Sequence, residues 1–339
     1  MSDTSPQRFV IVTTMKNEGA FMLEWIAYSR SIGFTDFVIF TNDCEDGTDK
    51  IAARLDDLGI ATHVPNRLKP GVSPQRKALR RARFQEVVKS ADWLMSADVD
   101  EFLNIRVGSG HLSDLMDAVG NVDAISICWK LFGNGGHTAY RRGFVTEQFF
   151  RCAPENRFPN FRARGVKTLF RNSGKFARMG VHRPRLCDPP EPCIWVDGGG
   201  NPVSEAFQHR GWKASPGFTH DYARLHHYAV RSVESFLVKR DRGRTNHVNV
   251  DQGLEYWRHM NANHRPDKSI LERLSAARLE YGRLLADDVL ASLHEQACRW
   301  HEDKINELLG REGWPEFRRA IGAITGGAPT KREAAHGAA

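Results

Sequence analysis

Residues 93–103 read Trp-Leu-Met-Ser-Ala-Asp-Val-Asp-Glu-Phe-Leu, and this stretch carries most of the information about the fold. Its first five residues predict an apolar strand that runs directly into Asp98 and Asp100. Because side chains two residues apart in an extended chain point to the same face, both carboxylates face one ligand just past the strand's end. That edge of an open α/β sheet is where ligands bind. Oxygen ligands suit Mg²⁺ or Mn²⁺ rather than zinc.

The neighbouring segments alternate between strand and helix patterns. Short apolar, β-branched runs predict strands at residues 9–14, 37–40, 60–64, 93–97 and 123–129. Apolar residues at helical spacing predict helices between them, around residues 21–32, 51–58, 75–89 and 111–119. Strands that alternate with helices indicate βαβ units and a parallel sheet. The sequence therefore predicts an α/β fold.

The second half of the chain has a weaker pattern. Residues 140–225 are rich in Pro, Gly, Arg and aromatic residues, which predicts irregular structure. Helical spacing returns at residues 231–240, 270–285 and 289–309. The small and polar residues 326–339 predict a disordered tail.

Composition narrows the class of protein. The 339 residues are 41% hydrophobic and 26% charged, which is ordinary for a globular protein. No stretch approaches about 18 consecutive apolar residues, and the first residues lack the apolar segment of a secretory signal, so no transmembrane segment is expected. Six scattered cysteines without C-x-x-C spacing predict reduced thiols and a cytoplasmic protein. Whether Cys187 and Cys193 pair stays open.

The net charge of +7 admits nucleic acid, an anionic membrane surface or a phosphate-bearing small molecule as a partner. Much of the excess lies at residues 76–83 and 239–244. Apolar or acidic residues interrupt both runs, which favours charged faces of helices, with anion sites as the second interpretation.

Several ordered motifs resemble those of a known enzyme family. They are Lys16-Asn17-Glu18-Gly19, Asp46-Gly47-Thr48, Asp98-Val99-Asp100-Glu101-Phe102 and the segments 129–133, 167–170, 181–184 and 226–232. Across residues 8–245 the chain resembles family 2-type glycosyltransferases of the GT-A fold, in the bacterial branch with a K-N-E-G start and a D-V-D-E-F motif. The resemblance implies a Rossmann-like, mostly parallel sheet flanked by helices over residues 1–250. A helical C-terminal extension over 251–325 and the tail at 326–339 would follow.

The function implied by this resemblance is metal-dependent transfer of a sugar from a nucleotide-diphosphate donor to a hydroxyl group. The family favours UDP-sugars and inversion of the anomeric carbon. The implied acceptor is a hydroxyl-bearing glycan or a lipid-linked glycan, in surface polysaccharide or glycan synthesis. Such an enzyme is expected in the cytoplasm, with peripheral contact at the inner face of the membrane.

The resemblance also implies which residues bind the donor. Thr13, Glu18 and Asp43 would contact the base and ribose, and Lys239, in the basic segment around Gly243, would approach the diphosphate. Three of these residues have a second interpretation. Glu18 suits a helix N-terminus, Asp43 suits a turn, and Lys239 belongs to a run of solvated charges.

The implied cofactor is Mn²⁺ or Mg²⁺, bound by Asp98 and Asp100 between the two phosphates of the donor. His227 would be a further metal ligand, in preference to His226; a core-edge histidine is the alternative. A cation there stabilises the charge that grows on the leaving nucleoside diphosphate, which makes Asp100 a predicted catalytic residue.

An inverting transferase also needs a carboxylate base for the acceptor hydroxyl. Glu101 is the nearest carboxylate and the second predicted catalytic residue, although it also suits a structural role in the loop. Glu147 and Asp251 are more distant alternatives. The Q/R-x-x-R-W marker of family 2 does not occur in a convincing position, so the base is left open. His182, beside Arg183, is a candidate contact to phosphate or acceptor.

Two other functions compete with this interpretation. A metal-dependent nucleotidyltransferase or phosphohydrolase would use the same aspartates, but neither G-x-x-x-x-G-K-[ST] nor G-x-G-x-x-G occurs near the first strand. A basic nucleic-acid-binding protein is supported by the sequence pI of about 9.2. The chain shows no recognition module and no basic tail, so no nucleic-acid partner is expected.

Overall fold

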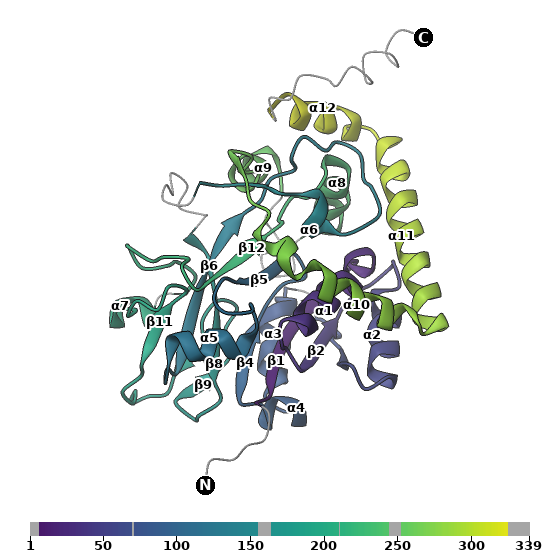
Figure 1. Cartoon of the computed structure of the whole chain (residues 1–339). Coiled ribbons are helices and arrows are strands. Elements are labelled where there is room, and N and C mark those ends of the chain that lie inside the picture. The colour runs from purple at the N-terminus through teal and green to yellow at the C-terminus, as the bar shows by residue number, and fades with distance from the viewer. Residues whose placement is uncertain (1–6, 70, 155–163, 210, 244–251, 325–339) are drawn as a thin grey trace.

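The computed structural model describes residues 7–69, 71–154, 164–209, 211–243 and 252–324. A nine-stranded sheet runs through the molecule in the order β3-β2-β1-β4-β8-β6-β12-β5, and β11 pairs with β6 (Figure 1). Its strands are β1 (Phe9–Met15), β2 (Asp36–Thr41), β3 (Thr62–Pro65), β4 (Trp93–Ser96), β5 (Glu101–Ile105), β6 (Ala124–Leu131), β8 (Val166–Arg171), β11 (Trp195–Asp197) and β12 (Ala223–His227).

Helices and two short strand pairs complete the fold. The helices are α1 (Gly19–Ser31), α2 (Thr48–Asp57), α3 (Pro74–Ala82), α4 (Glu86–Lys89), α5 (Leu112–Val119), α6 (Val145–Gln148), α7 (Glu205–Gln208), α8 (Val233–Arg242), α9 (Leu254–Met260), the 3-10 helix η2 (Ser269–Arg273), α10 (Leu274–Leu285), α11 (Asp288–Leu309) and α12 (Trp314–Ile324). The short pairs join β9 (Phe176–Arg178) with β10 (Arg185–Leu186), and β7 (Arg151–Cys152) with β13 (Arg265–Pro266).

Strand β1 shows why the sheet is covered on both faces. Phe9 and Ile11 belong to the core under α1 and α2, whereas Val10 and Val12 belong to a second core under α3 and α4. Successive side chains of a strand point to opposite faces, so a strand buried on both must be apolar at nearly every position. The continuous run Phe9–Met15 is buried throughout.

The sheet is mostly parallel, and its parallel pairs position the aspartates. β1 pairs in parallel with β2 and with β4. β8 is antiparallel to both β4 and β6, and β5 is antiparallel to β12. Asp98 and Asp100 follow the carboxyl end of β4, between β4 and β5. The chain therefore turns at the edge of the sheet where α/β proteins bind ligands.

The predicted α/β class, with a central mostly parallel sheet and C-terminal helices, is confirmed. The five predicted strands are present, with ends within two residues of those expected. The prediction that residues 140–225 are irregular is wrong, because they contain β8 and β11. β5 was not predicted either. Each of these strands pairs with segments far away in sequence, so local patterns reveal little of them.

The basic helix predicted over residues 75–89 is in fact two helices, α3 and α4. Ala82 and Val88 are both buried in the same core. Residues six positions apart in a continuous α-helix point to very different sides, so one straight helix cannot bury both. The break at residues 83–85 lets each helix turn its apolar side to the sheet.

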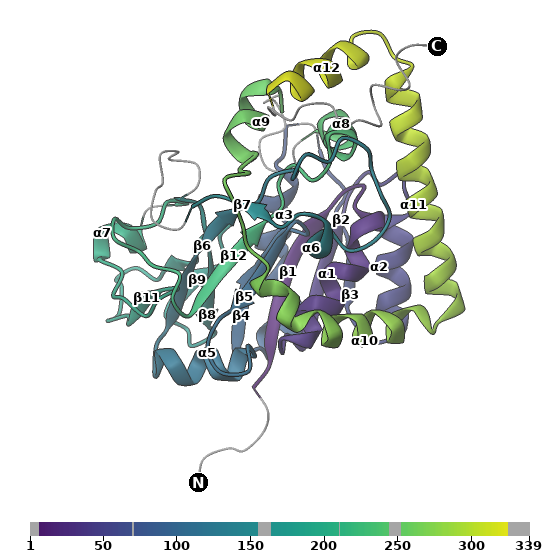
Figure 2. The same cartoon turned by 45° about the horizontal axis from the view of Figure 1, so that its top comes forward.

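The C-terminal helices wrap around the N-terminal part of the sheet. α10 crosses α1, α11 rises along one side of the molecule, and α12 lies across its top (Figure 2). Arg54 on α2 forms an ion pair with Asp287 at the start of α11, with a shortest distance of 2.5 Å. The division at residue 250 stays a prediction, and the tail at 326–339 lies outside the described residues.

Two smaller observations bear on the sequence predictions. All six cysteines lie within the described residues and are free, so Cys187 and Cys193 are not joined. No helix in the described part of the chain is long and apolar enough to cross a bilayer.

Candidate active site

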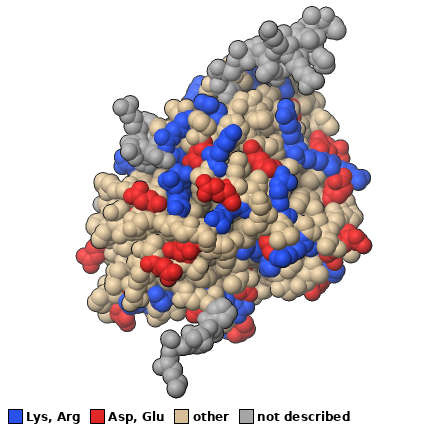
Figure 3. All heavy atoms as spheres, viewed as in Figure 1, with Lys and Arg blue, Asp and Glu red and all other residues tan. Residues whose placement is uncertain are grey.

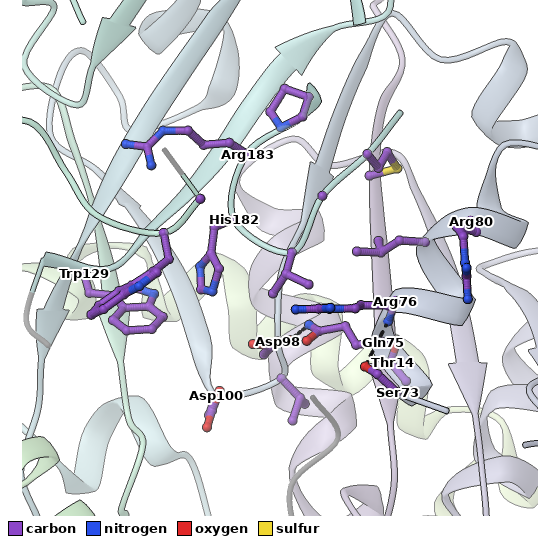
Figure 4. Close-up of a pocket in the computed structure, with 18 of the residues that line it drawn as sticks. Thr14, Ser73, Gln75, Arg76, Arg80, Asp98, Asp100, Trp129, His182 and Arg183 are labelled. Carbon is purple, nitrogen blue, oxygen red and sulfur yellow. Dashed lines mark hydrogen bonds between the residues drawn. The ribbon is translucent and has the colours of Figure 1, made fainter. Parts of the chain in front are cut away.

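A cleft of about 1510 Å³ opens at the carboxyl ends of β1 and β4. Its walls come from α3, from the β9–β10 hairpin with its connecting residues, and from α8, with the aspartate loop between them. Figure 4 shows Asp98 beside Gln75 and Arg76, and His182 between Trp129 and Asp98. Ligand pockets usually measure about 300–1,000 Å³, so this cleft has room for more than one small ligand.

Asp98 is held at the cleft by two donors. Its Oδ1 accepts a hydrogen bond from Gln75 Nε2 at 2.7 Å, and its Oδ2 accepts one from Lys167 Nζ at 3.0 Å. The Asp98 side chain is 36% exposed, whereas the Lys167 side chain is fully buried. The carboxylate is therefore fixed from behind and open on its cleft side.

Asp100 is more deeply buried than Asp98. Lys239 Nζ on α8 donates to its Oδ2 at 2.5 Å, and His227 Nε2 lies 3.7 Å from its Oδ1. Burial alone would raise the pKa of this carboxyl, but Lys239 and the His227 ring outweigh it and hold the pKa well below the usual range. Asp100 is ionised, and three elements distant in sequence converge on it.

Glu101, predicted as a catalytic residue, is fully buried and is not among the residues that line the cleft. Its Oε1 accepts from Trp129 Nε1 at 2.7 Å, and its Oε2 accepts from the backbone N–H of Asp98 at 2.9 Å. Lys167 Nζ lies 3.4 Å from the same Oε2. These contacts fix the aspartate loop. The geometry therefore favours a structural role for Glu101 over the role of the base that deprotonates the acceptor hydroxyl.

An aromatic wall faces the aspartates. The Trp129 ring lies 4.5 Å from the His227 ring and 5.8 Å from the His182 ring, centroid to centroid. His182 Nδ1 is 2.9 Å from the carbonyl oxygen of Val166. Because a carbonyl only accepts, Nδ1 carries the hydrogen, and Nε2 is left as an acceptor. Burial and the charge of Lys167 lower the pKa of His182 to about 3, so this ring is neutral.

The predicted donor-binding residues have different surroundings. Glu18 lines the cleft, is buried, and pairs with Arg231 at 3.0 Å and with Arg242. Thr13 is buried and Asp43 is exposed, and neither lines the cleft; Thr14 does. Lys239 lines the cleft beside Asp100. The structure thus brings Glu18, Asp98, Asp100, Lys239 and His227 together, and leaves Thr13, Asp43 and Glu101 outside the cavity.

The other base candidates do not reach this cavity. Glu147 forms an ion pair with Arg278 at 2.5 Å and is not a cleft residue. Asp251 lies outside the described residues. Of the two basic residues at the start of α3, Arg76 lines the cleft and Lys77 does not. The Nζ of Lys77 donates to the carbonyl of Arg67 instead.

Sequence reasoning missed the role of Lys167, which joins Asp98 to Glu101. A signal for it existed. Lys167 lies in the strand Val166–Arg171, where five of six residues are buried, and a lysine is almost never fully buried without a partner. Arg231, which pairs with Glu18 and stacks on Phe21 at 3.6 Å, was missed too. Its partner Glu18 is 213 residues away along the chain, so no local pattern points to Arg231.

The fit of a divalent cation depends on the donor atoms in the cleft. No group of three or more His, Cys, Asp and Glu side chains in the described ranges is arranged to hold a metal ion. Asp98, Asp100 and His227 nevertheless line one cleft. Mg²⁺ and Mn²⁺ often take only one or two protein carboxylates, with phosphate and water completing the shell. The residues fit a cation that arrives with phosphate ligands, not an all-protein metal centre.

Comparison with known families identifies the protein as a glycosyltransferase. The matching family is glycosyltransferase family 92, whose model covers residues 10–198. Because that is more than half of the chain, the protein belongs to family 92. The resemblance stated above is thus confirmed for the glycosyltransferase class, while the family that matches is 92 rather than 2.

Two curated relatives carry the same family name. The chain is 31% identical to a family 92 protein of Ricinus communis over 118 residues, which is 34% of this chain and 20% of that protein. It is 24% identical to a family 92 protein of Oryza sativa subsp. japonica over 151 residues, covering 43% of this chain and 25% of that protein. The matched segments therefore span only a fifth to a quarter of these relatives.

Solved structures show weaker likeness. Residues 1–349 of S. aureus TarS in complex with UDP match with 14% identity and a TM-score of 0.32, covering 49% of this chain and 47% of that one. Glucosyl-3-phosphoglycerate synthase from Mycobacterium tuberculosis, in complex with Mn²⁺, UDP and glucosyl-3-phosphoglycerate, matches with 16% identity and a TM-score of 0.26, covering 49% and 57%. At these scores neither structure informs the site of this chain.

The packing around Trp129 gives a first prediction. An alanine Cβ at Gly165 would lie 2.2 Å from atoms of the Trp129 ring, so Gly165→Ala must displace the tryptophan. We expect the free energy of unfolding in urea to fall by about 1–3 kcal/mol, the usual cost of overpacking. Gly282→Ala is the matched control, because nothing lies within 4 Å of its Cβ on α10. It should stabilise the chain by about 0.5–1 kcal/mol. Equal unfolding free energies for Gly165→Ala and native protein would contradict this packing.

Proposed function

We propose that this protein transfers a sugar from a nucleotide-diphosphate donor, most simply a UDP-sugar, to a hydroxyl group of a glycan or lipid-linked acceptor. The observation that carries the proposal is the convergence of Asp98, Asp100 and Lys239 in one cleft at the carboxyl end of β4. Paired carboxylates and a lysine are the groups that a metal–diphosphate complex needs. Inversion at the anomeric carbon, which the sequence motifs suggested through their resemblance to family 2, is kept as part of the proposal.

Each residue of the cleft has a role in this proposal. Asp98 and Asp100, with His227, hold Mn²⁺ or Mg²⁺, and the bound cation would offset charge on the leaving diphosphate. Lys239 is partly exposed beside Asp100 and can donate to a phosphate oxygen as well as to the carboxylate. Glu18, with its partners Arg231 and Arg242, forms one side of the donor site. His182 offers a neutral Nε2 that accepts a hydrogen bond from a sugar hydroxyl.

The competing functions have less support in the cleft. A phosphohydrolase or nucleotidyltransferase with two metal ions needs further carboxylates, and among the described residues only Glu18, Asp98 and Asp100 line the cavity as acids. Nucleic-acid binding calls for a continuous basic surface. On the face seen in Figure 3, basic and acidic side chains are interspersed. Cytoplasmic action near a membrane remains part of the proposal.

Thermal unfolding with nucleotides tests the donor and the metal together. UDP, GDP and CDP are each added with and without Mn²⁺. We expect one nucleotide, UDP by this proposal, to raise the melting temperature only when Mn²⁺ is present. A ligand at a hundredfold excess over its Kd stabilises the folded state by about 2.7 kcal/mol, which is readily measured.

The control is Asp221→Asn, an exposed aspartate outside the cleft lining, which should keep the nucleotide effect. Asp98→Asn should lose it. If no nucleotide changes the melting temperature under any condition, the proposed donor is wrong. If the nucleotide acts equally well without Mn²⁺, the metal site is wrong and the nucleotide site stands.

A further inference from the structure

The cleft carries more positive charge than its own carboxylates need. Of the described residues that line it, seven are Arg or Lys and three are Asp or Glu. Each acid already has a basic partner: Glu18 pairs with Arg231 and Arg242, Asp98 with Lys167, and Asp100 with Lys239. Two of these partners lie outside the lining: Arg231, which pairs with Glu18, and Lys167, which Asp98 shares with the buried Glu101.

The excess is concentrated in four arginines at the outer part of the cleft. Arg76 and Arg80 are on α3, and Arg178 and Arg185 are on the β9–β10 hairpin. All four side chains are exposed and line the cleft. Within the described part of the chain, none of them makes a side-chain hydrogen bond or an ion pair with a carboxylate. We call these four residues the arginine rim.

The rim is arranged in two like-charge pairs. Arg178 and Arg185 are direct partners in the antiparallel ladder of β9 and β10, so their side chains share one face. Arg76 and Arg80 are four residues apart on α3 and also share a face. Figure 4 shows Arg76 reaching toward Asp98, with Arg80 further along α3. Like charges in either arrangement destabilise the fold, and here both pairs face the same cavity.

The proposed donor does not account for the rim. The negative charge of a diphosphate ester and the positive charge of a divalent cation offset each other, so the donor complex brings little net charge. Lys239, beside Asp100, already serves the phosphates in that proposal. The cavity is also larger than a single small ligand requires. A second ligand that is anionic would fill the remaining volume of the cavity and neutralise the charge of the arginines.

We infer that the arginine rim binds the acceptor, and that the acceptor is an acidic glycan with a carboxylate or phosphate close to the hydroxyl that receives the sugar. Arginine suits this role because its planar fork donates two parallel hydrogen bonds to a carboxylate or a phosphate. Two pairs on different elements of the same cavity suit anions spaced along one chain. The identification of this ligand as the acceptor rests on the proposed function.

Direct binding to the rim is measurable without a donor. The probes are fluorescently labelled trigalacturonate, which carries carboxylates, an oligosaccharide of the same length ending in glucose 6-phosphate, and neutral maltotriose. We expect the native chain to bind at least one acidic probe and to bind maltotriose much more weakly. Which acidic probe binds tells carboxylate from phosphate. Arg178→Gln/Arg185→Gln and Arg76→Gln/Arg80→Gln should each weaken acidic-probe binding about tenfold or more, as expected for lost charged hydrogen bonds.

The control is Lys50→Gln/Arg106→Gln, which removes the same charge from exposed sites outside the cleft. It should leave probe affinity nearly unchanged. Because the rim pairs repel, the melting temperature of Arg178→Gln/Arg185→Gln should equal or exceed that of the native chain, so lost binding cannot be attributed to unfolding.

Three results would overturn the inference. They are equal binding of acidic and neutral probes, equal loss of binding in the control, and loss of the UDP and Mn²⁺ effect in Arg178→Gln/Arg185→Gln. The last result would assign the hairpin arginines to the donor. If UDP fails to bind the native chain while the acidic probe still binds through the rim, the proposed function fails and the anion site remains.

Discussion

Asp98→Asn/Asp100→Asn is expected to slow donor turnover by about a thousandfold or more, since a bound cation supplies several kcal/mol of transition-state stabilisation and each 1.36 kcal/mol is a factor of ten. The asparagines keep the shape of both side chains but remove their charge. Lys167 and Lys239 then leave the site strongly positive, which repels a divalent cation. The measurement is release of UDP from a panel of UDP-sugars with Mn²⁺, which needs no known acceptor.

Folding must be separated from turnover in this experiment. Asp100 is buried against Lys239, so its replacement alone can destabilise the chain. Asp98→Asn serves as the second variant, because Asp98 is partly exposed and keeps Gln75 as a neighbour. Asp221→Asn is again the matched control. If Asp98→Asn is folded and releases UDP at the native rate, the aspartate pair does not bind the metal.

Lys167→Met is expected to lower the free energy of unfolding by about 3–5 kcal/mol, the usual cost of removing one partner of a buried ion pair. The Lys167 and Glu101 side chains are both fully buried. Methionine fills much of the same space but leaves Glu101 without its cation. Urea unfolding gives the value, and Lys89→Met is the control. Lys89 is half exposed and pairs with the exposed Glu86, so its loss should cost less than about 1 kcal/mol.

The double variant Lys167→Met/Glu101→Gln distinguishes this mechanism from simple misfit. Removing both charges should recover part of the lost stability, because the buried charge is then gone.

The stability deficit of Lys167→Met should also depend on pH, in a direction that the pKa of Glu101 fixes. Burial already raises the pKa of Glu101, and loss of Lys167 raises it further. The folded state then binds the proton more tightly than the unfolded state, so the deficit of Lys167→Met should shrink as the pH is lowered from about 8 to about 5. A deficit independent of pH, with no recovery in the double variant, would contradict the ion-pair account.

Local sequence pattern predicted the scaffold well where elements are completed by near neighbours. The run from Phe9 to Met15 had to be a strand buried on both faces, and the neighbouring strands and helices followed from the same periodicity. Pattern failed at β5 and β8, because an edge pairing and an antiparallel insertion depend on segments more than thirty residues away along the chain.

The candidate site shows the same division. The pair Asp98 and Asp100 was visible in the sequence as two acids directly after an apolar strand. The two residues lie in a turn closed by the Glu101 N–H and the Asp98 carbonyl at 3.0 Å, rather than in the extended chain that was expected. For Glu101 the sequence left a catalytic and a structural role open, since its partners Trp129 and Lys167 are distant in the chain. Thr13 and Asp43 were expected at the nucleotide; neither lines the cleft, and their contacts with base and ribose stay a prediction.

The sequence alone determined the fold class, the aspartates at the end of β4 and the overall positive charge, because these depend on periodicity and composition. Only the tertiary structure decided which charges neutralise one another. Lys167 pairs with Asp98 and Lys239 pairs with Asp100, while Arg76, Arg80, Arg178 and Arg185 stay available at the cleft. Coulomb interactions depend on distance in space and on burial, and neither quantity can be read from spacing along the chain.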